Sequence, residues 1–184
     1  MIMALASGEM SGIPIPKKTR AGVKRFLREI SGGKDGGSYG YTDSPGGGKG
    51  SNAMNAVGFF CAQLMGASSN ASKAFESSMI LDKSGFDLND IYYAYYGTLA
   101  AYQHQGPVWR KWLGKMQESF VKAQEADGSW TLKGSHTNQM GKGIMTALVT
   151  LCMEAHYRYT PLYGLGFEPD PAGPSPDVLE GEQL

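Results

Sequence analysis

Residues 90–99 read Asp-Ile-Tyr-Tyr-Ala-Tyr-Tyr-Gly-Thr-Leu, and this stretch decides the fold class. After Asp90 it holds only aromatic, small and apolar residues, which is typical of a helix enclosed by other helices. The next segment, 107–124, is of a different kind, because it is amphipathic and charged and has Pro107 in its first turn. The two kinds of segment alternate along the chain, whereas strand signals are poor. We therefore predict an all-α protein.

The same pattern predicts the other helices. Glycine-rich segments, 32–50 and 125–141, are expected to be loops. Four prolines and five acidic residues lie in the tail 167–184, which we expect to be extended and mostly unpacked. The domain organisation predicted is thus a helical segment over residues 1–166 and a tail over 167–184. The helices are predicted at 2–11, 17–31, 52–66, 71–82, 88–104, 107–124 and 142–160.

The segments repeat along the chain. The small and apolar helices contain Ala4, Ala56, Ala94 and Ala147, which are separated by 52, 38 and 53 residues. Two loops also share a sequence, since Gly37-Ser38-Tyr39 follows one amphipathic helix and Gly128-Ser129-Trp130 follows another. A period near 50 residues indicates an array of helix pairs. Small-residue helices would form an inner layer, and amphipathic helices an outer layer with one face in water.

The loop 124–130 carries a family resemblance. Its sequence, Gln-Glu-Ala-Asp-Gly-Ser-Trp, fits Q-x-x-x-G-x-W and resembles the repeat motif of squalene-hopene and oxidosqualene cyclases. The resemblance implies that Gln124 caps an outer helix and stacks on Trp130, with Gly128 in the turn. Segment 33–41 looks like a degenerate copy with Tyr39 in place of Trp. The segments 90–99, 108–112 and 146–163 are similar to terpenoid cyclase and prenyltransferase repeats.

The resemblance implies a partial α/α toroid of inner and outer helices. A full ring of this family has six helix pairs, and this chain would supply about half of them. Its open ends would expose apolar flanks. We therefore expect another copy of the chain, or the rest of a longer polypeptide, to cover those ends.

The positions that match the active sites of this family do not carry its chemistry. Cyclases use Asp-x-Asp-Asp, but in the matching segment 87–90 Asn89 stands in place of the proton-donating acid. Prenyltransferases place a zinc-binding Cys where Tyr92 stands, and a neutral phenol is a poor zinc ligand. Asp87 and Asp90 are therefore weak catalytic candidates, and the alternative is a helix start with Asp87 as N-cap and Asp90 at N3.

We expect no metal and no cofactor. The three histidines, His104, His136 and His156, form no spaced ligand set. The cysteines, Cys61 and Cys152, each lie within an apolar segment, which is typical of buried free thiols.

A cluster of tyrosines is the feature of the sequence that most resembles a ligand-binding or reactive site. Its members could line a cavity and stabilise a ligand through their π faces, or they could simply pack. Adjacent residues on a helix point in different directions, so at most about half of them can face a lumen. The candidates are Tyr92, Tyr93, Tyr95, Tyr96 and Tyr102.

Composition excludes several classes of protein. The 184 residues include 17 Lys and Arg against 17 Asp and Glu, so nothing supports nucleic-acid binding through a basic excess. No apolar run approaches the roughly 20 residues that span a bilayer. Residues 1–11 lack a basic region and do not read as a signal peptide. We expect a soluble chain, and the sequence does not identify its cellular compartment.

Two functions remain open. The first is a non-catalytic repeat module that binds a protein, a peptide or an isoprenoid ligand in its concave lumen. The alternative is a subunit, or the C-terminal part, of a squalene-cyclase-like or prenyltransferase enzyme. The absent acid at Asn89 and the absent thiolate at Tyr92 favour the first function.

Overall fold

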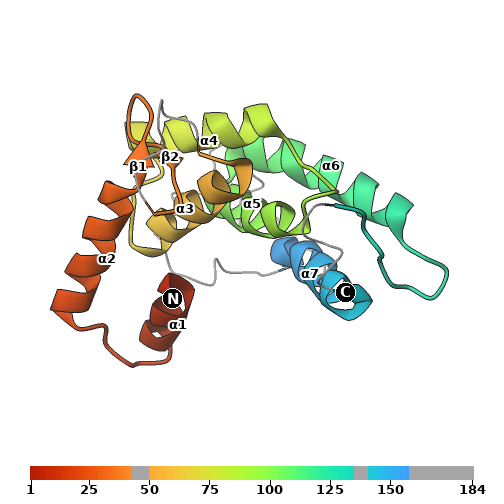
Figure 1. The fold of residues 1–184 in the computed structure, drawn as a ribbon, viewed down its shortest axis with the longest axis horizontal. Helices are drawn as coiled ribbons and strands as arrows, with labels where there is room; N and C mark the ends of the chain where they lie inside the picture. Colours follow the sequence, from red (N-terminus) through yellow and green to blue (C-terminus); the bar gives the residue numbers. More distant parts are fainter. Residues whose placement is uncertain (43–49, 135–140, 158–184) are drawn as a thin grey trace, which may run out of the picture.

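A computed structural model describes residues 1–42, 50–134 and 141–157 (Figure 1). These residues form seven α-helices and one small two-stranded sheet, which confirms the all-α prediction. Each of the seven predicted helices is present; six of them lie within three residues of their expected bounds, whereas the helix predicted at 142–160 ends at Glu154 and residues 158–160 lie outside the described part of the chain. The predicted tail, 167–184, and the domain limit at 166 lie outside the described residues. The helices are α1 (Ile2–Met10), α2 (Lys17–Glu29), α3 (Asn52–Leu64), α4 (Ser72–Ser84), α5 (Ile91–His104), α6 (Gly106–Ala123) and α7 (Gly141–Glu154), and a short 3-10 helix (Ala155–Tyr157) follows α7.

The helices form two layers. In the inner layer α1, α3, α5 and α7 pack side by side in chain order, with α3 and α5 in the centre. In the outer layer α2 packs on α3, α4 packs on α3 and α5, and α6 packs on α5 and α4. Figure 1 shows the layers as an arc, with α1 and α7 at the two ends of its inner side. That this arc is a partial α/α toroid, about half of a six-pair ring, stays a prediction.

Small residues in the inner helices make room for aromatic rings. A Cβ atom on Gly58 of α3 would lie 2.1 Å from the ring of Tyr39. A Cβ atom on Gly97 of α5 would lie 2.4 Å from the ring of Trp112, which comes from outer helix α6. Since real Cβ atoms do not approach so closely, each glycine is required by the aromatic residue beside it.

The structure contains a β-hairpin that the sequence did not predict. At the start of the expected loop 32–50, and including Ser31 from the helix predicted at 17–31, β1 (Ser31–Gly32) pairs antiparallel with β2 (Ser38–Tyr39), with Ser31 opposite Tyr39. Strands of two residues are too short to show an alternating pattern. A distant side chain holds the hairpin, because Glu76 of α4 accepts hydrogen bonds from the backbone N–H groups of Lys34, Asp35 and Gly37 at 2.7–2.8 Å.

The electrostatics of Glu76 agree with this role. Burial acts to raise the pKa of its carboxyl group, but the three backbone hydrogen bonds and the nearby Lys34 outweigh burial and hold the pKa below its usual value. The ionised carboxylate therefore ties α4 to the loop of the preceding helix pair.

The two loops with a shared sequence occupy equivalent places. The backbone N–H of Tyr39 donates to Asn55 Oδ1 of α3 at 2.8 Å, and that of Trp130 donates to Thr146 Oγ1 of α7 at 3.2 Å. Each hydrogen bond spans 16 residues. The second set lies 91 residues after the first, so two helix pairs make one repeating unit. The sequence period near 50 averaged unequal spacings, since the inner helices begin at residues 2, 52, 91 and 141.

Candidate functional site

The five candidate tyrosines divide into two groups. Tyr93 and Tyr102 face outer helix α6, where their rings meet those of Trp112 and Trp109 edge to face at centroid distances of 5.6 and 5.2 Å. Tyr93 is fully buried and its hydroxyl donates to the carbonyl oxygen of Gly85 at 2.8 Å. These two tyrosines are therefore packing residues that join α5 to the outer layer.

The other three tyrosines form a row, which we call the tyrosine row: Tyr92, Tyr95 and Tyr96. The ring of Tyr96 lies 4.8 Å from that of Tyr92 and 5.1 Å from that of Tyr95. Tyr92 is 36% exposed. Burial, together with the neighbouring phenols, raises the pKa of Tyr96 above its usual value, so its hydroxyl is neutral at physiological pH. The row thus has one exposed ring, Tyr92, and two half-buried rings, Tyr95 and Tyr96, which pack against the core.

A cavity of about 540 Å³ adjoins this row at the starts of α3 and α5. Tyr41, Met54 and Tyr92 supply its apolar and aromatic wall, while Asp90 and the helix start 51–53 supply polar atoms. Tyr41 is 77% exposed. Sequence reasoning missed Tyr41 and Met54, because they come from a loop end and a different helix. The sequence signal that could have found Tyr41 is an aromatic residue beside a glycine-rich loop.

The structure corrects the expected roles of the two acidic candidates. Asp90, and not Asp87, is the N-cap of α5, and its Oδ1 accepts the backbone N–H of Tyr93 at 3.0 Å. Asp87 Oδ1 instead accepts the backbone and side-chain N–H groups of Asn89 at 2.9 and 3.3 Å. This local turn delays the helix start from residue 88 to 91. Both carboxylates therefore have structural roles, although Asp90 also lines the cavity.

The repeat motif at the end of α6 makes two hydrogen bonds from side chains to the backbone. Gln124 is the C-cap of α6, and its Nε2 donates to the carbonyl oxygen of Gly128 at 3.0 Å. The buried Trp130 makes the contact with the helix, since its indole Nε1 donates to the carbonyl oxygen of Phe120 at 2.8 Å. Phe120 belongs to the last turn, whose carbonyls lack partners within the helix. The stacking of Gln124 on Trp130 stays a prediction.

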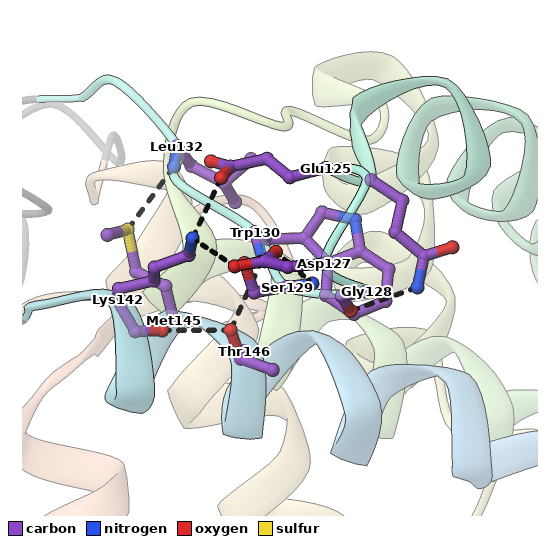
Figure 2. Close-up of polar contacts among 10 residues, drawn as sticks. Glu125, Asp127, Gly128, Ser129, Trp130, Leu132, Lys142, Met145 and Thr146 are labelled. Carbon is purple, nitrogen blue, oxygen red and sulfur yellow. Dashed lines mark hydrogen bonds and ion pairs between the residues drawn. The ribbon is translucent and has the colours of Figure 1, made fainter.

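A lysine of α7 clamps the same turn (Figure 2). Lys142 Nζ lies 2.8 Å from a carboxylate oxygen of Glu125 and 2.7 Å from one of Asp127. The hydrogen bond from Lys142, followed by those from Ser129, holds the pKa of Asp127 well below its usual value. All three charged groups are solvent-exposed, so the clamp orders the turn more than it stabilises the fold.

The cysteines do not carry activated thiols. Burial raises the pKa of Cys61 to about 11 and that of Cys152 to about 12. Both thiols are free and protonated at neutral pH. Cys152 is buried as predicted, whereas Cys61 is only partly covered and lies close enough to Tyr96 to influence its pKa.

Neither a metal centre nor a membrane span emerges from the residues that the structure describes. Within them no three His, Cys, Asp or Glu side chains gather as a metal site would require. His136 lies outside these residues. Among the same residues no helix combines the length and the apolar character that a transmembrane span needs.

Comparison of the chain with protein-family models, curated proteins and solved structures found no match. The resemblance to terpenoid cyclases and prenyltransferases therefore rests on the sequence motifs alone and stays a prediction. The tyrosine row and its cavity are the features of the described residues that bear on function.

Proposed function

We propose that this chain is a non-catalytic helical-repeat module that binds an elongated apolar ligand, an isoprenoid or an apolar peptide, along the tyrosine row. One observation carries the proposal: the cavity is lined by Tyr41, Met54 and Tyr92, and the half-buried rings of Tyr96 and then Tyr95 follow Tyr92 in contact with one another. A ligand that enters the cavity could continue along the row.

The size and lining of the cavity support this function. A volume of about 540 Å³ is within the range of small-molecule sites, which are lined mainly by apolar and aromatic side chains with a few polar groups. An aromatic row adds large, rigid contact area at a low cost in conformational entropy. Alkyl and isoprenoid chains gain free energy roughly in proportion to the apolar surface that they bury there.

The local chemistry supports binding rather than catalysis. The carboxylate of Asp90 is engaged as the N-cap of α5, and Asn89 holds the position where the resemblance expects an acid. The partly covered thiol of Cys61 is protonated, because burial raises its pKa to about 11. Activated nucleophiles and acids have pKa values closer to the working pH.

Calorimetric titration with farnesol and with a capped Leu-Ala-Leu-Leu peptide tests this function. We expect at least one of the two to bind, and Tyr92→Ser to weaken that binding about tenfold, which corresponds to about 1.4 kcal/mol. Phe75→Ser is the matched control, because Phe75 is 64% exposed on outer helix α4. Equal binding by the two variants, or binding of neither ligand by the parent chain, would contradict the proposal.

A further inference from the structure

Helix α2 carries positive charge that the described residues do not neutralise. Six of its 13 residues are Lys or Arg, and only Glu29 is acidic. Two of the six cations are paired, since Arg20 binds Glu9 of α1 and Arg25 Nε lies 3.7 Å from Glu29 Oε1. The described part of the chain offers no ion pair to the other four, which are Lys17, Lys18, Lys24 and Arg28.

Three of these unpaired cations form one row, which we call the α2 stripe: Lys17, Lys24 and Arg28. An α-helix turns by about 100° per residue, so the three positions lie within about 40° of one another around the helix axis. All three residues are exposed. Lys24 and Arg28 are four residues apart, a spacing at which like charges repel. The stripe would therefore be stabilised by an anionic partner.

The charge of the stripe also acts on a neighbouring helix. Burial, followed by the charge of Arg28, lowers the pKa of Lys73 in α4, although Glu76 acts in the opposite direction. The carboxylate of Glu76 is already engaged, because it accepts three backbone N–H groups of the hairpin. Positive charge therefore stays in excess around Arg28.

The opposite charge lies in the segment 167–184, outside the described residues. This segment contains five acidic residues and no Lys or Arg, whereas the whole chain has a formal net charge of zero. The segment thus has as many uncompensated negative charges as α2 has positive ones. Its acidic residues are Glu168, Asp170, Asp177, Glu180 and Glu182.

The spacing of the last three acidic residues suits the stripe. At about 1.5 Å per residue, the helix places the three stripe cations about 10 and 6 Å apart along its axis. At about 3.1 Å per residue, an extended segment of the kind that the prolines predict places Asp177, Glu180 and Glu182 about 9 and 6 Å apart. The two sets of charges can therefore pair one to one.

The chain is long enough to bring these acidic residues to the stripe. Figure 1 shows α2 and the described end of the chain at opposite ends of the arc. Packed helix axes lie about 8–10 Å apart, so the four inner helices span about 30 Å from α1 to α7. Asp177 lies 20 positions after Tyr157, a length of chain that covers up to about 60 Å when it is extended.

We propose that the segment 177–182 binds the α2 stripe of the same chain. Its three carboxylates pair in order with the three stripe cations. Each exposed pair is weak alone, but the covalent connection raises the effective concentration of the segment at the stripe. The contact joins the two ends of the arc. The inference rests on the charges of α2 and is independent of ligand binding at the tyrosine row.

Carbodiimide coupling of the full chain tests this inference, because the reagent joins a lysine Nζ to a neighbouring carboxylate as an amide, with loss of water. Mass spectrometry of the digested chain identifies the joined residues. We expect the segment 177–182 to couple to Lys17 and Lys24 about tenfold more than to Lys83, an exposed lysine of α4. Salt at about 1 M reduces the Debye length to about 3 Å and should abolish this coupling.

A standard and two variants control the test. Lys142 Nζ lies 2.7 Å from a carboxylate oxygen of Asp127, so coupling of this pair shows that the reaction has worked at low salt. Lys24→Gln should lower coupling at Lys17 about threefold, because the segment loses one of its three partners. Arg25→Gln, which removes a paired cation outside the stripe, should leave coupling at Lys17 unchanged.

Four results would overturn the inference. In the first, the standard pair couples but the segment 177–182 does not couple to the stripe. In the second, Glu168 and Asp170 couple to the stripe as often as this segment does, or Lys83 couples as often as the stripe lysines. In the third, Lys24→Gln and Arg25→Gln have equal effects. In the fourth, a mixture of ¹⁴N and ¹⁵N chains yields links between chains, which would assign the stripe to the tail of a second copy.

Discussion

Removal of the Trp130 indole tests the contact that ends α6. Trp130 is 6% exposed, and its Nε1 donates to the carbonyl oxygen of Phe120 at 2.8 Å. Truncation of a buried aromatic residue to Ala costs about 3–5 kcal/mol. The site lies near a surface loop where water can reach the freed carbonyl, so we expect Trp130→Ala to lower the free energy of unfolding by about 3–4 kcal/mol. Trp130→Phe keeps most of the buried ring and should cost only about 1–2 kcal/mol, the value of the lost hydrogen bond.

Urea denaturation and thermal melting measure both variants. For a chain of this size, 1 kcal/mol moves the melting midpoint by about 2–4 °C, so Trp130→Ala should lower it by roughly 10 °C. Tyr157→Ala is the control, because Tyr157 is 67% exposed and its loss should change the free energy by less than about 0.5 kcal/mol. The reasoning is refuted if Trp130→Ala behaves like Tyr157→Ala. The role of the hydrogen bond is refuted if Trp130→Phe leaves stability unchanged.

Three further predictions concern other parts of the chain. Gly97→Ala should destabilise the protein by about 1–3 kcal/mol, because the new Cβ atom would lie 2.4 Å from the Trp112 ring. Gly114→Ala is the control in the same denaturation assay. It should be neutral or stabilising, because Gly114 has open space around it. The pKa of Glu76 in the folded state lies below its usual value, so its carboxylate stabilises the fold above the unfolded-state pKa, and this stabilisation is lost as the pH falls through the folded-state pKa. Glu76→Gln should therefore be less stable than the parent at pH 7, and a pH series of melts should show the difference in stability shrinking in acid. A difference that stays constant with pH would argue against the hairpin clamp. Elemental analysis of the purified chain should find no stoichiometric zinc, and about one zinc per chain after mild chelation would revive the prenyltransferase interpretation.

The helices could be predicted from the sequence because their signals are local. Alternation between small-apolar segments such as 90–99 and amphipathic segments such as 107–124 identified both layers. The hairpin could not be predicted, because its strands have two residues each and Glu76, about 40 residues away, holds its turn. Long-range hydrogen bonds of this kind leave no periodic pattern in the sequence.

The candidate site was only partly predictable. The sequence identified five tyrosines, but only their contacts separate Tyr93, which packs on Trp112, from Tyr92 and Tyr96, whose rings contact each other. The N-cap of α5 was misplaced, because Asp87 and Asp90 both suit a helix start and the turn at Asn89 decides between them. The cavity itself joins residues from a loop and two helices, and such a meeting follows from packing rather than from spacing.

The most direct test of the proposed function follows the methionine methyl groups during a titration with farnesol. Met54 lines the cavity beside Tyr92, whereas Met79 is 53% exposed on outer helix α4. In a chain labelled with ¹³C at the methionine methyl groups, we predict a saturable shift of the Met54 signal and an unchanged Met79 signal. A shift of Met79 without Met54, or a Met54 signal that does not move with farnesol or with the Leu-Ala-Leu-Leu peptide, would contradict binding at the tyrosine row.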